Sequence, residues 1–218
     1  MSDFPIIPAD DTVLVLTHMQ NEFAHPDGKG ARIVYQFLKE SGALGRMQRL
    51  LAACRGAGVP VIFHNETFRP GHPELRARRH GYCRGTARML GVVPDNMAVR
   101  GTWGAEVIDD LRPDPGRDEF VLHNAKVDPF TCSEFETLLR NLDRHVLLLA
   151  GLACNFGIEM TARSGNERDY GICVVSDCVD RFLGDYSERT LTDLLPLYGR
   201  VATTAEIIAE LEQQQRPR

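Results

Sequence analysis

The residues best placed to carry chemistry lie between residues 145 and 163, where an apolar run leads through a small-residue turn directly into a helix. Backbone N–H groups at the start of a helix can hold negative charge that develops during a reaction. Cys154 lies in this turn, and a thiol near a helix N-terminus has a lowered pKa. His18 ends another apolar run, and histidine can act as a general acid or base near neutral pH. These two turns predict oxyanion stabilisation and acid–base chemistry.

The elements that must position these turns can be traced along the chain. Apolar runs typical of buried parallel strands occupy residues 13–17, 60–64, 119–123, 146–150 and 171–176, with a short strand around Val201. Helices are expected at residues 31–57, 133–142, 155–169 and 187–195, and from Thr204 onward. This alternation predicts an α/β fold with a doubly wound, mainly parallel sheet and helices on both faces. Ligands bind such sheets beyond the carboxyl ends of the strands.

Length and composition bound the class of protein. The chain has 218 residues, which suits a single domain over residues 1–218. Its hydrophobic content of 43% and charged content of 25% are ordinary for a globular protein, and no apolar run approaches the roughly 18 residues of a membrane span. A net charge of −5 gives no reason to expect nucleic acid or an anionic membrane as a partner.

The N-terminus and the cysteines indicate a reducing compartment. The first residues are acidic and lack the basic region of a secretory signal, so a cytoplasmic location is expected. The six cysteines form no C-x-x-C pair, so they are expected to be reduced, buried and free of metal. No cofactor is expected either.

Four motifs, in the same order along nearly the whole chain, carry a resemblance to a known family. They read VLVLTHMQNEF, GTWGAEVIDDL, GLACNFGIEMTAR and VVSDCVD. Together they resemble the isochorismatase-like, or cysteine hydrolase, superfamily. The resemblance implies a Rossmann-like three-layer fold, hydrolysis of a small-molecule substrate, and assembly as a homodimer or homotetramer.

Amidases of that superfamily use an aspartate after the first strand, a lysine after the third and a cysteine at the helix start. Here His18 stands in place of the aspartate and Gly157 in place of the cysteine. Counting without gaps puts Asn124 at the lysine position. Lys126 lies two residues further on, and residues two apart on a strand share a face, so either side chain could serve the site.

The resemblance also implies an oxyanion hole that does not need the missing thiol. Its two donors would be the backbone amides of Ala153 and Gly157, with a cis peptide bond between Leu152 and Ala153. Isochorismatases proper also carry glycine at the helix start, and they hydrolyse a vinyl ether without a covalent intermediate. A noncovalent hydrolase is therefore one interpretation of this chain.

Cys154 could replace the missing nucleophile. It occupies the place where the family usually has threonine, about 5 Å or one helical turn before Gly157. Since a misplacement of even about 1 Å can greatly slow a reaction, Cys154 is either a displaced nucleophile or a small packing residue.

Substrate contacts are expected from Gln20, Phe23 and Cys154 beside the two turns, from Trp103, and from Arg69. Trp103 either shapes the pocket or packs its own loop. The arginines from Arg69 to Arg88 belong to residues 65–101, a long excursion over the site, and they either bind a carboxylate or form a solvated or intersubunit face. The nicotinamidase branch of the superfamily binds zinc through a D-x-H motif. Asn65 and Thr67 stand at those positions here, so no metal is expected.

Two classes of function remain open. The first is a hydrolase of an amide, ester or vinyl ether in which His18 is the general acid or base. The second is a pseudoenzyme that has kept the fold as a ligand-binding or assembly protein. The altered catalytic positions favour the second class, whereas the polar character of His18 and Asn124 favours the first.

Overall fold

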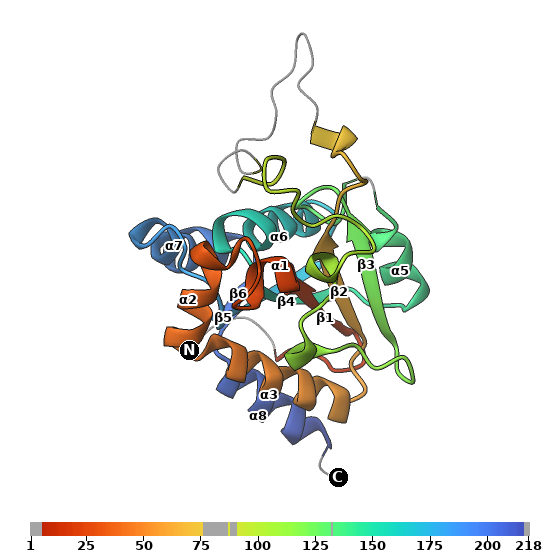
Figure 1. The fold of residues 1–218 in the computed structure, drawn as a ribbon. Helices are drawn as coiled ribbons and strands as arrows, with labels where there is room; N and C mark the ends of the chain where they lie inside the picture. Colours follow the sequence, from red (N-terminus) through yellow and green to blue (C-terminus); the bar gives the residue numbers. More distant parts are fainter. Residues whose placement is uncertain (1–5, 76–86, 88–90, 132, 216–218) are drawn as a thin grey trace.

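A parallel sheet forms the centre of the protein in the computed structural model, which describes residues 6–75, 87, 91–131 and 133–215. Within the described residues the sheet has six strands in the order β3-β2-β1-β4-β5-β6, and every neighbouring pair is parallel (Figure 1). The strands are β1 Thr12–Thr17, β2 Val61–Glu66, β3 Glu119–Asn124, β4 Val146–Gly151, β5 Gly171–Val179 and β6 Arg200–Ala202. The predicted α/β fold is confirmed.

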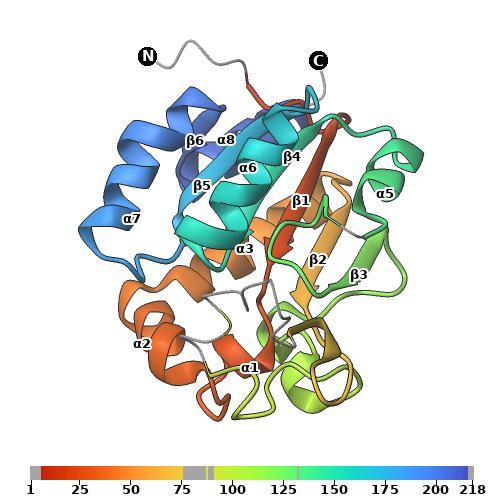
Figure 2. The same cartoon turned by 90° about the horizontal axis from the view of Figure 1, so that it is seen from above.

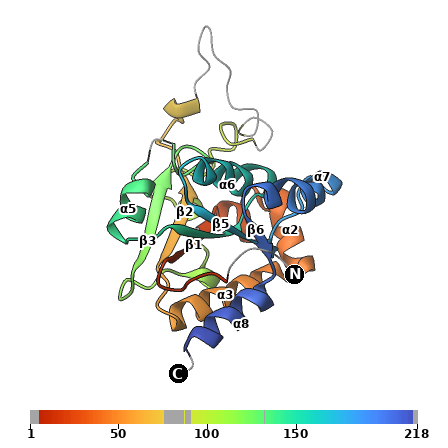
Figure 3. The ribbon, with the colours of Figure 1, turned by 180° about the vertical axis from the view of Figure 1, so that it is seen from behind.

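Helices cover both faces of this sheet. They are α1 Asn21–Ala24, α2 Ala31–Ser41, α3 Ala43–Gly56, α5 Phe135–Asn141, α6 Glu159–Asn166, α7 Asp185–Arg189 and α8 Thr204–Gln215. Figures 1 and 3 show α3 and α8 on one face and α5, α6 and α7 on the other. In the described part of the chain, no helix is both long and apolar enough to cross a membrane.

The core is divided by the sheet into two layers. On β1, Leu14 and Leu16 face the α3 and α8 layer, while Val13 and Val15 face the α5 and α6 layer. All six residues of β1 are buried, because both faces of the strand are covered. This burial explains why the central strands read as continuous apolar runs rather than as alternating patterns.

Several predicted element boundaries were wrong. The helix expected over residues 31–57 is two helices, since Gly42 between them adopts a left-handed φ of 70°. The helix expected over 155–169 begins as a π-turn, Cys154–Ile158, and becomes α-helical only at Glu159. The helix expected over 187–195 is α7 followed by a second π-turn, Thr190–Leu194. The short helix α1 was not anticipated.

Described segments between β2 and β3 lie near the carboxyl end of the sheet. Phe68 forms an isolated bridge with Val99, and Gln20 forms one with Val107. Figure 2 shows α1 and α2 at the end of the sheet towards which β1 runs. The described parts of the predicted excursion therefore lie near the carboxyl ends of the strands, where a ligand is expected.

Candidate functional site

His18 is held in a sharp turn immediately after β1. Its φ of 54° is in the left-handed region, which residues other than glycine seldom adopt. Its backbone N–H donates to the His64 carbonyl at 2.7 Å, and the residue is 6% exposed. The chain thus leaves the sheet at His18, and the turn holds the imidazole in a buried position.

The turn after β4 contains the predicted cis peptide bond between Leu152 and Ala153. The Leu152 N–H donates to the Thr17 carbonyl at 2.8 Å, which ties this turn to the end of β1. Gly151 has a φ of 110°, and a Cβ on it would collide with the Thr17 carbonyl oxygen, so only glycine fits there. The two turns that carry His18 and Gly157 are therefore joined through Thr17.

His18 and Gly157 meet across this junction. A Cβ built on Gly157 would lie 2.7 Å from Thr17 Cγ2, 2.8 Å from the Leu152 carbonyl oxygen and 3.1 Å from His18 Nε2. A Cβ at position 157 would thus be crowded by both backbone and side-chain atoms. The imidazole nitrogen that faces this position is His18 Nε2.

A second imidazole lies beside His18. His64, on β2, is completely buried, and its ring centroid is 4.8 Å from that of His18 at an interplanar angle of 47°. Burial lowers the pKa of His64 to about 3, although the backbone of Lys126 against the ring partly opposes the shift. The sequence did not predict that His64 would lie against His18. Its place near the end of the strand beside β1 was the signal that could have found it.

Asn124 and Lys126 have different surroundings. The Asn124 side-chain amide donates to the carbonyls of Asp128 and Thr131 at 3.0 and 3.1 Å, and its oxygen accepts from the Lys126 N–H at 3.2 Å. These bonds hold the loop that follows β3. The Lys126 backbone lies against the His64 ring, so this part of the loop adjoins the histidine pair.

Cys154 packs against α7. Its side chain is fully buried and its Sγ lies 3.6 Å from the Ser187 carbonyl oxygen. Burial, followed by the nearby Asp180 carboxylate, raises the pKa of the thiol to about 12. A thiol with this pKa holds its proton at neutral pH, so the geometry supports the packing interpretation.

We therefore expect Cys154→Ala to leave kcat unchanged, because the thiol contacts the Ser187 carbonyl oxygen and its raised pKa keeps it protonated near neutral pH. Steady-state kinetics would measure this, together with iodoacetamide labelling of the folded protein, in which Cys154 should stay unmodified. A loss of turnover in a variant that keeps its melting temperature would restore the nucleophile hypothesis.

Asp180 anchors the same turn and was missed from the sequence. Its carboxylate accepts from the Cys154 N–H at 2.9 Å and from the Phe182 N–H at 2.8 Å, and the residue is fully buried. Burial raises the pKa of this carboxyl group. It lies in the VVSDCVD motif, but nothing in that motif indicates which amides its side chain accepts from.

Replacing Asp180 by alanine is expected to destabilise the fold by roughly 2 kcal/mol or more, since one buried and one partly buried N–H group would lose their acceptor. Urea unfolding would measure the change. Asp185→Ala, which removes an exposed carboxylate from α7, is the matched control and should leave stability near wild type. Equal stability of the two variants would contradict the anchoring role.

The expected substrate-binding residues are spread more widely. Gln20 is fully buried: its amide donates to the Glu66 and Ala105 carbonyls at 3.0 and 3.3 Å, and its oxygen accepts from the Glu66 N–H at 2.8 Å. Phe23 packs in the core. These two side chains build the frame around the site.

Trp103 and Arg69 are nearer the surface. The Trp103 residue is 49% exposed and its ring contacts His25 edge to face, with 5.0 Å between centroids. Arg69 pairs with Glu74 at 2.7 Å. The other arginines considered for carboxylate binding, Arg76, Arg78, Arg79, Arg84 and Arg88, lie outside the described residues.

The main-chain atoms of residues 103–108 dock this segment beside the site. The Asn21 side-chain amide donates to the Trp103 carbonyl at 2.9 Å, and the Asn21 N–H donates to the Glu106 carbonyl at 2.9 Å. The Ile108 N–H donates to the Met19 carbonyl at 3.0 Å. With the Gln20 contact to Ala105, these bonds define a docked segment, residues 103–108.

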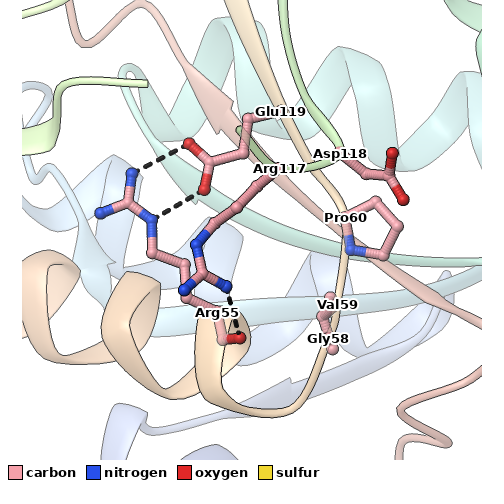
Figure 4. Close-up of a pocket in the computed structure, with 7 residues that line it drawn as sticks. All are labelled: Arg55, Gly58, Val59, Pro60, Arg117, Asp118 and Glu119. Atoms are coloured by element: carbon pink, nitrogen blue, oxygen red, sulfur yellow. Dashed lines mark hydrogen bonds and ion pairs between the residues drawn. The ribbon is translucent and has the colours of Figure 1, made fainter. Parts of the chain in front are cut away.

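The hollow drawn in Figure 4 is not this site. It is lined by Arg55, Gly58, Val59, Pro60, Arg117, Asp118 and Glu119. Arg55 contacts the Glu119 carboxylate with two nitrogens at 2.7 and 2.9 Å, which ties α3 to β3. Because β2 and β3 begin here, the hollow lies at the end of the sheet opposite His18, and we assign this ion pair a structural role.

Comparisons with known proteins agree with this geometry. The family model for the isochorismatase domain matches residues 12–206. Ureidoacrylate amidohydrolase RutB from Methylorubrum extorquens is 26% identical over 216 residues, covering 96% of this chain and 86% of that protein. The protein of the same name from Caulobacter vibrioides is 26% identical over 208 residues, with 93% and 91% covered.

Solved structures show the same fold. A cysteine hydrolase from Pseudomonas syringae pv. phaseolicola superposes with a TM-score of 0.77 at 25% identity, covering 98% of this chain and 99% of that one. N-carbamoylsarcosine amidase from Thermoplasma acidophilum gives 0.70 at 25% identity, with 89% and 96% covered. The chain belongs to the isochorismatase family of hydrolases.

Proposed function

We propose that this protein hydrolyses a C–N bond of a small polar substrate without a covalent enzyme intermediate, with His18 as the general base. The observation that carries the proposal is the approach of His18 Nε2 to Gly157, the position from which a nucleophilic side chain would otherwise extend. The amidohydrolase and amidase named among the similar proteins support a C–N bond rather than an ester or a vinyl ether.

The proposed reaction begins with a water molecule between His18 and the substrate carbonyl carbon. His18 Nε2 takes a proton as the water oxygen bonds to that carbon, and the carbonyl electrons move to oxygen. The N–H groups of Ala153 and Gly157 stabilise this oxyanion, and one such donor is typically worth about 100-fold to 1000-fold in kcat. When the intermediate collapses, the C–N bond breaks and the His18 imidazolium returns its proton to the leaving nitrogen.

We assign Asn124 and Lys126 separate roles in this proposal. Asn124 orders the loop after β3, because both its side-chain nitrogen and its side-chain oxygen form hydrogen bonds with that loop. Lys126 adjoins the histidine pair through its backbone, and we propose that its side chain orients the substrate. Lys126→Met would then raise KM, whereas Asn124→Ala would lower stability.

The test is turnover of a panel containing N-carbamoyl amino acids, ureidoacrylate, small amides, esters and isochorismate, carried out in oxygen-18 water with intact-protein mass spectrometry. The proposal expects C–N cleavage with no adduct on the protein, and an amide substrate should give a carboxylate labelled once with oxygen-18. A covalent adduct would overturn the mechanism, and turnover of isochorismate or esters alone would overturn the bond type. Ligands that raise the melting temperature without product would favour the pseudoenzyme.

A further inference from the structure

We propose that His64 is a positioning residue for the proposed general base: it accepts a hydrogen bond from His18 Nδ1, so that His18 Nε2 is unprotonated where it faces Gly157. The inference rests on the proposed function of His18. It adds a neutral histidine pair to the site, built from the ends of two neighbouring strands.

The direction of the proposed hydrogen bond, with His18 as donor and His64 as acceptor, follows from the contact between His18 and Gly157. His18 Nε2 lies 3.1 Å from the position that a Cβ on Gly157 would take, so this nitrogen faces the proposed water and substrate. Nδ1 is the remaining nitrogen of the ring. A base must present a lone pair to its water, and a neutral imidazole with a bare Nε2 carries its proton on Nδ1. Catalysis therefore needs an acceptor near Nδ1.

His64 has the location of such an acceptor. Its ring lies 4.8 Å from the His18 ring between centroids, and His18 is anchored to the His64 backbone carbonyl at 2.7 Å. That backbone bond sets the distance between the two residues independently of the His64 side chain. A substitution at His64 can thus remove the imidazole and keep the turn that holds His18.

The surroundings of His64 keep it neutral and orient it. The residue is fully buried, and the low pKa of its ring leaves an unprotonated nitrogen available at neutral pH. The Lys126 backbone acts to raise the pKa of the His64 ring, as a carbonyl oxygen does when it accepts a hydrogen bond from a ring N–H group. If one nitrogen of the His64 ring donates to this carbonyl, the other nitrogen is a hydrogen-bond acceptor. An orienting group sets the tautomer of a catalytic histidine in the same way.

Packing alone does not explain a histidine here. Apart from the contact with the Lys126 backbone, which falls outside ordinary hydrogen-bond length or angle, neither His64 ring nitrogen has a hydrogen-bond partner among the described residues. A buried polar group left in this state destabilises a fold, and a phenylalanine or leucine would fill the space without that penalty. Catalytic hydrogen bonds are often long in an unliganded enzyme and tighten when substrate binds, so a small ring rotation would complete the pair.

The first experiment reads the tautomer of His18 directly and needs no substrate. Nitrogen-15 histidine labelling and two-bond proton–nitrogen spectra near neutral pH distinguish the two tautomers, and the spectrum of His18→Asn assigns the His18 signals among seven histidines. We expect a proton on Nδ1 in the wild type and on Nε2 in His64→Phe. A wild-type proton on Nε2, or an unchanged His18 tautomer in His64→Phe, would overturn the inference.

The second experiment measures the consequence with a substrate found in the panel. His64→Phe should lower kcat about 10-fold to 100-fold with little change in KM, as loss of an orienting partner does elsewhere. His64→Gln, which restores an acceptor oxygen, should recover most of kcat, and His123→Phe is the control on β3. A flipped tautomer with full kcat would also overturn the positioning role. Because the spectra need no turnover, failure of the proposed function is distinguishable from failure of this inference.

Discussion

Replacing His18 by alanine is expected to lower kcat about 100-fold to 10 000-fold, the range typical of losing a general base. The reason is geometric: of the three atoms nearest to the Gly157 Cβ position, His18 Nε2 is the one that can act as a base. Steady-state kinetics on the substrate found in the panel would measure the loss. The melting temperature should change much less than kcat.

Two further variants isolate the role of the imidazole. His18 has a left-handed φ, which asparagine tolerates better than alanine does, so His18→Asn removes the base with little backbone strain. His145→Ala removes an exposed histidine that contacts Asp11 where β4 begins, and it should retain full activity. Wild-type kcat in His18→Asn would exclude His18 from the mechanism.

Restoring a cysteine at position 157 is expected to damage the enzyme rather than to revive covalent catalysis. The new Cβ would lie 2.8 Å from the Leu152 carbonyl oxygen, which is backbone, and 2.7 Å from Thr17 Cγ2. Overpacking of this kind typically destabilises a fold by about 1 to 3 kcal/mol. His18 would also have to move, so kcat should fall together with the free energy of unfolding. Urea unfolding and kinetics measure the two effects.

A matched control and a relief variant complete this test. Gly45 in α3 has no neighbour within 4 Å of its Cβ position, so Gly45→Cys introduces a thiol without crowding and should be tolerated. Thr17→Ser removes the Cγ2 methyl and should recover part of the stability lost in Gly157→Cys. A Gly157→Cys protein with wild-type stability and a substrate-derived adduct on the new thiol would show that the site can accommodate the covalent route.

The fold and the meeting of His18 with Gly157 were predictable because they depend on strong local signals. Continuous apolar runs mark buried strands, and the carboxyl ends of adjacent parallel strands necessarily converge. The strands β1 and β4 are such neighbours, so the turns after Thr17 and Gly151 had to meet. The cis bond before Ala153 followed from the family resemblance.

The missed features depend on contacts between segments far apart in the sequence. Gly42 ends one helix and begins the next within a segment whose apolar pattern continues on both sides. Periodicity alone cannot detect a single residue with a left-handed φ. His64 and Asp180 gain their significance from neighbours on other strands and turns. Asn124 stood at the right position for a site residue, but its amide is occupied by local backbone carbonyls, which no residue spacing reveals.

The docked segment, residues 103–108, has a consequence for altering substrate preference. The Asn21 and Gln20 amides and the Met19 carbonyl bond to it through Trp103, Ala105, Glu106 and Ile108 main-chain atoms. The backbone position of this segment therefore depends little on the segment's own side chains. Trp103 and Glu106 are both exposed, so they can be randomised in a mutant library while the backbone of the loop stays in place. This makes the segment a suitable target for directed evolution of substrate preference.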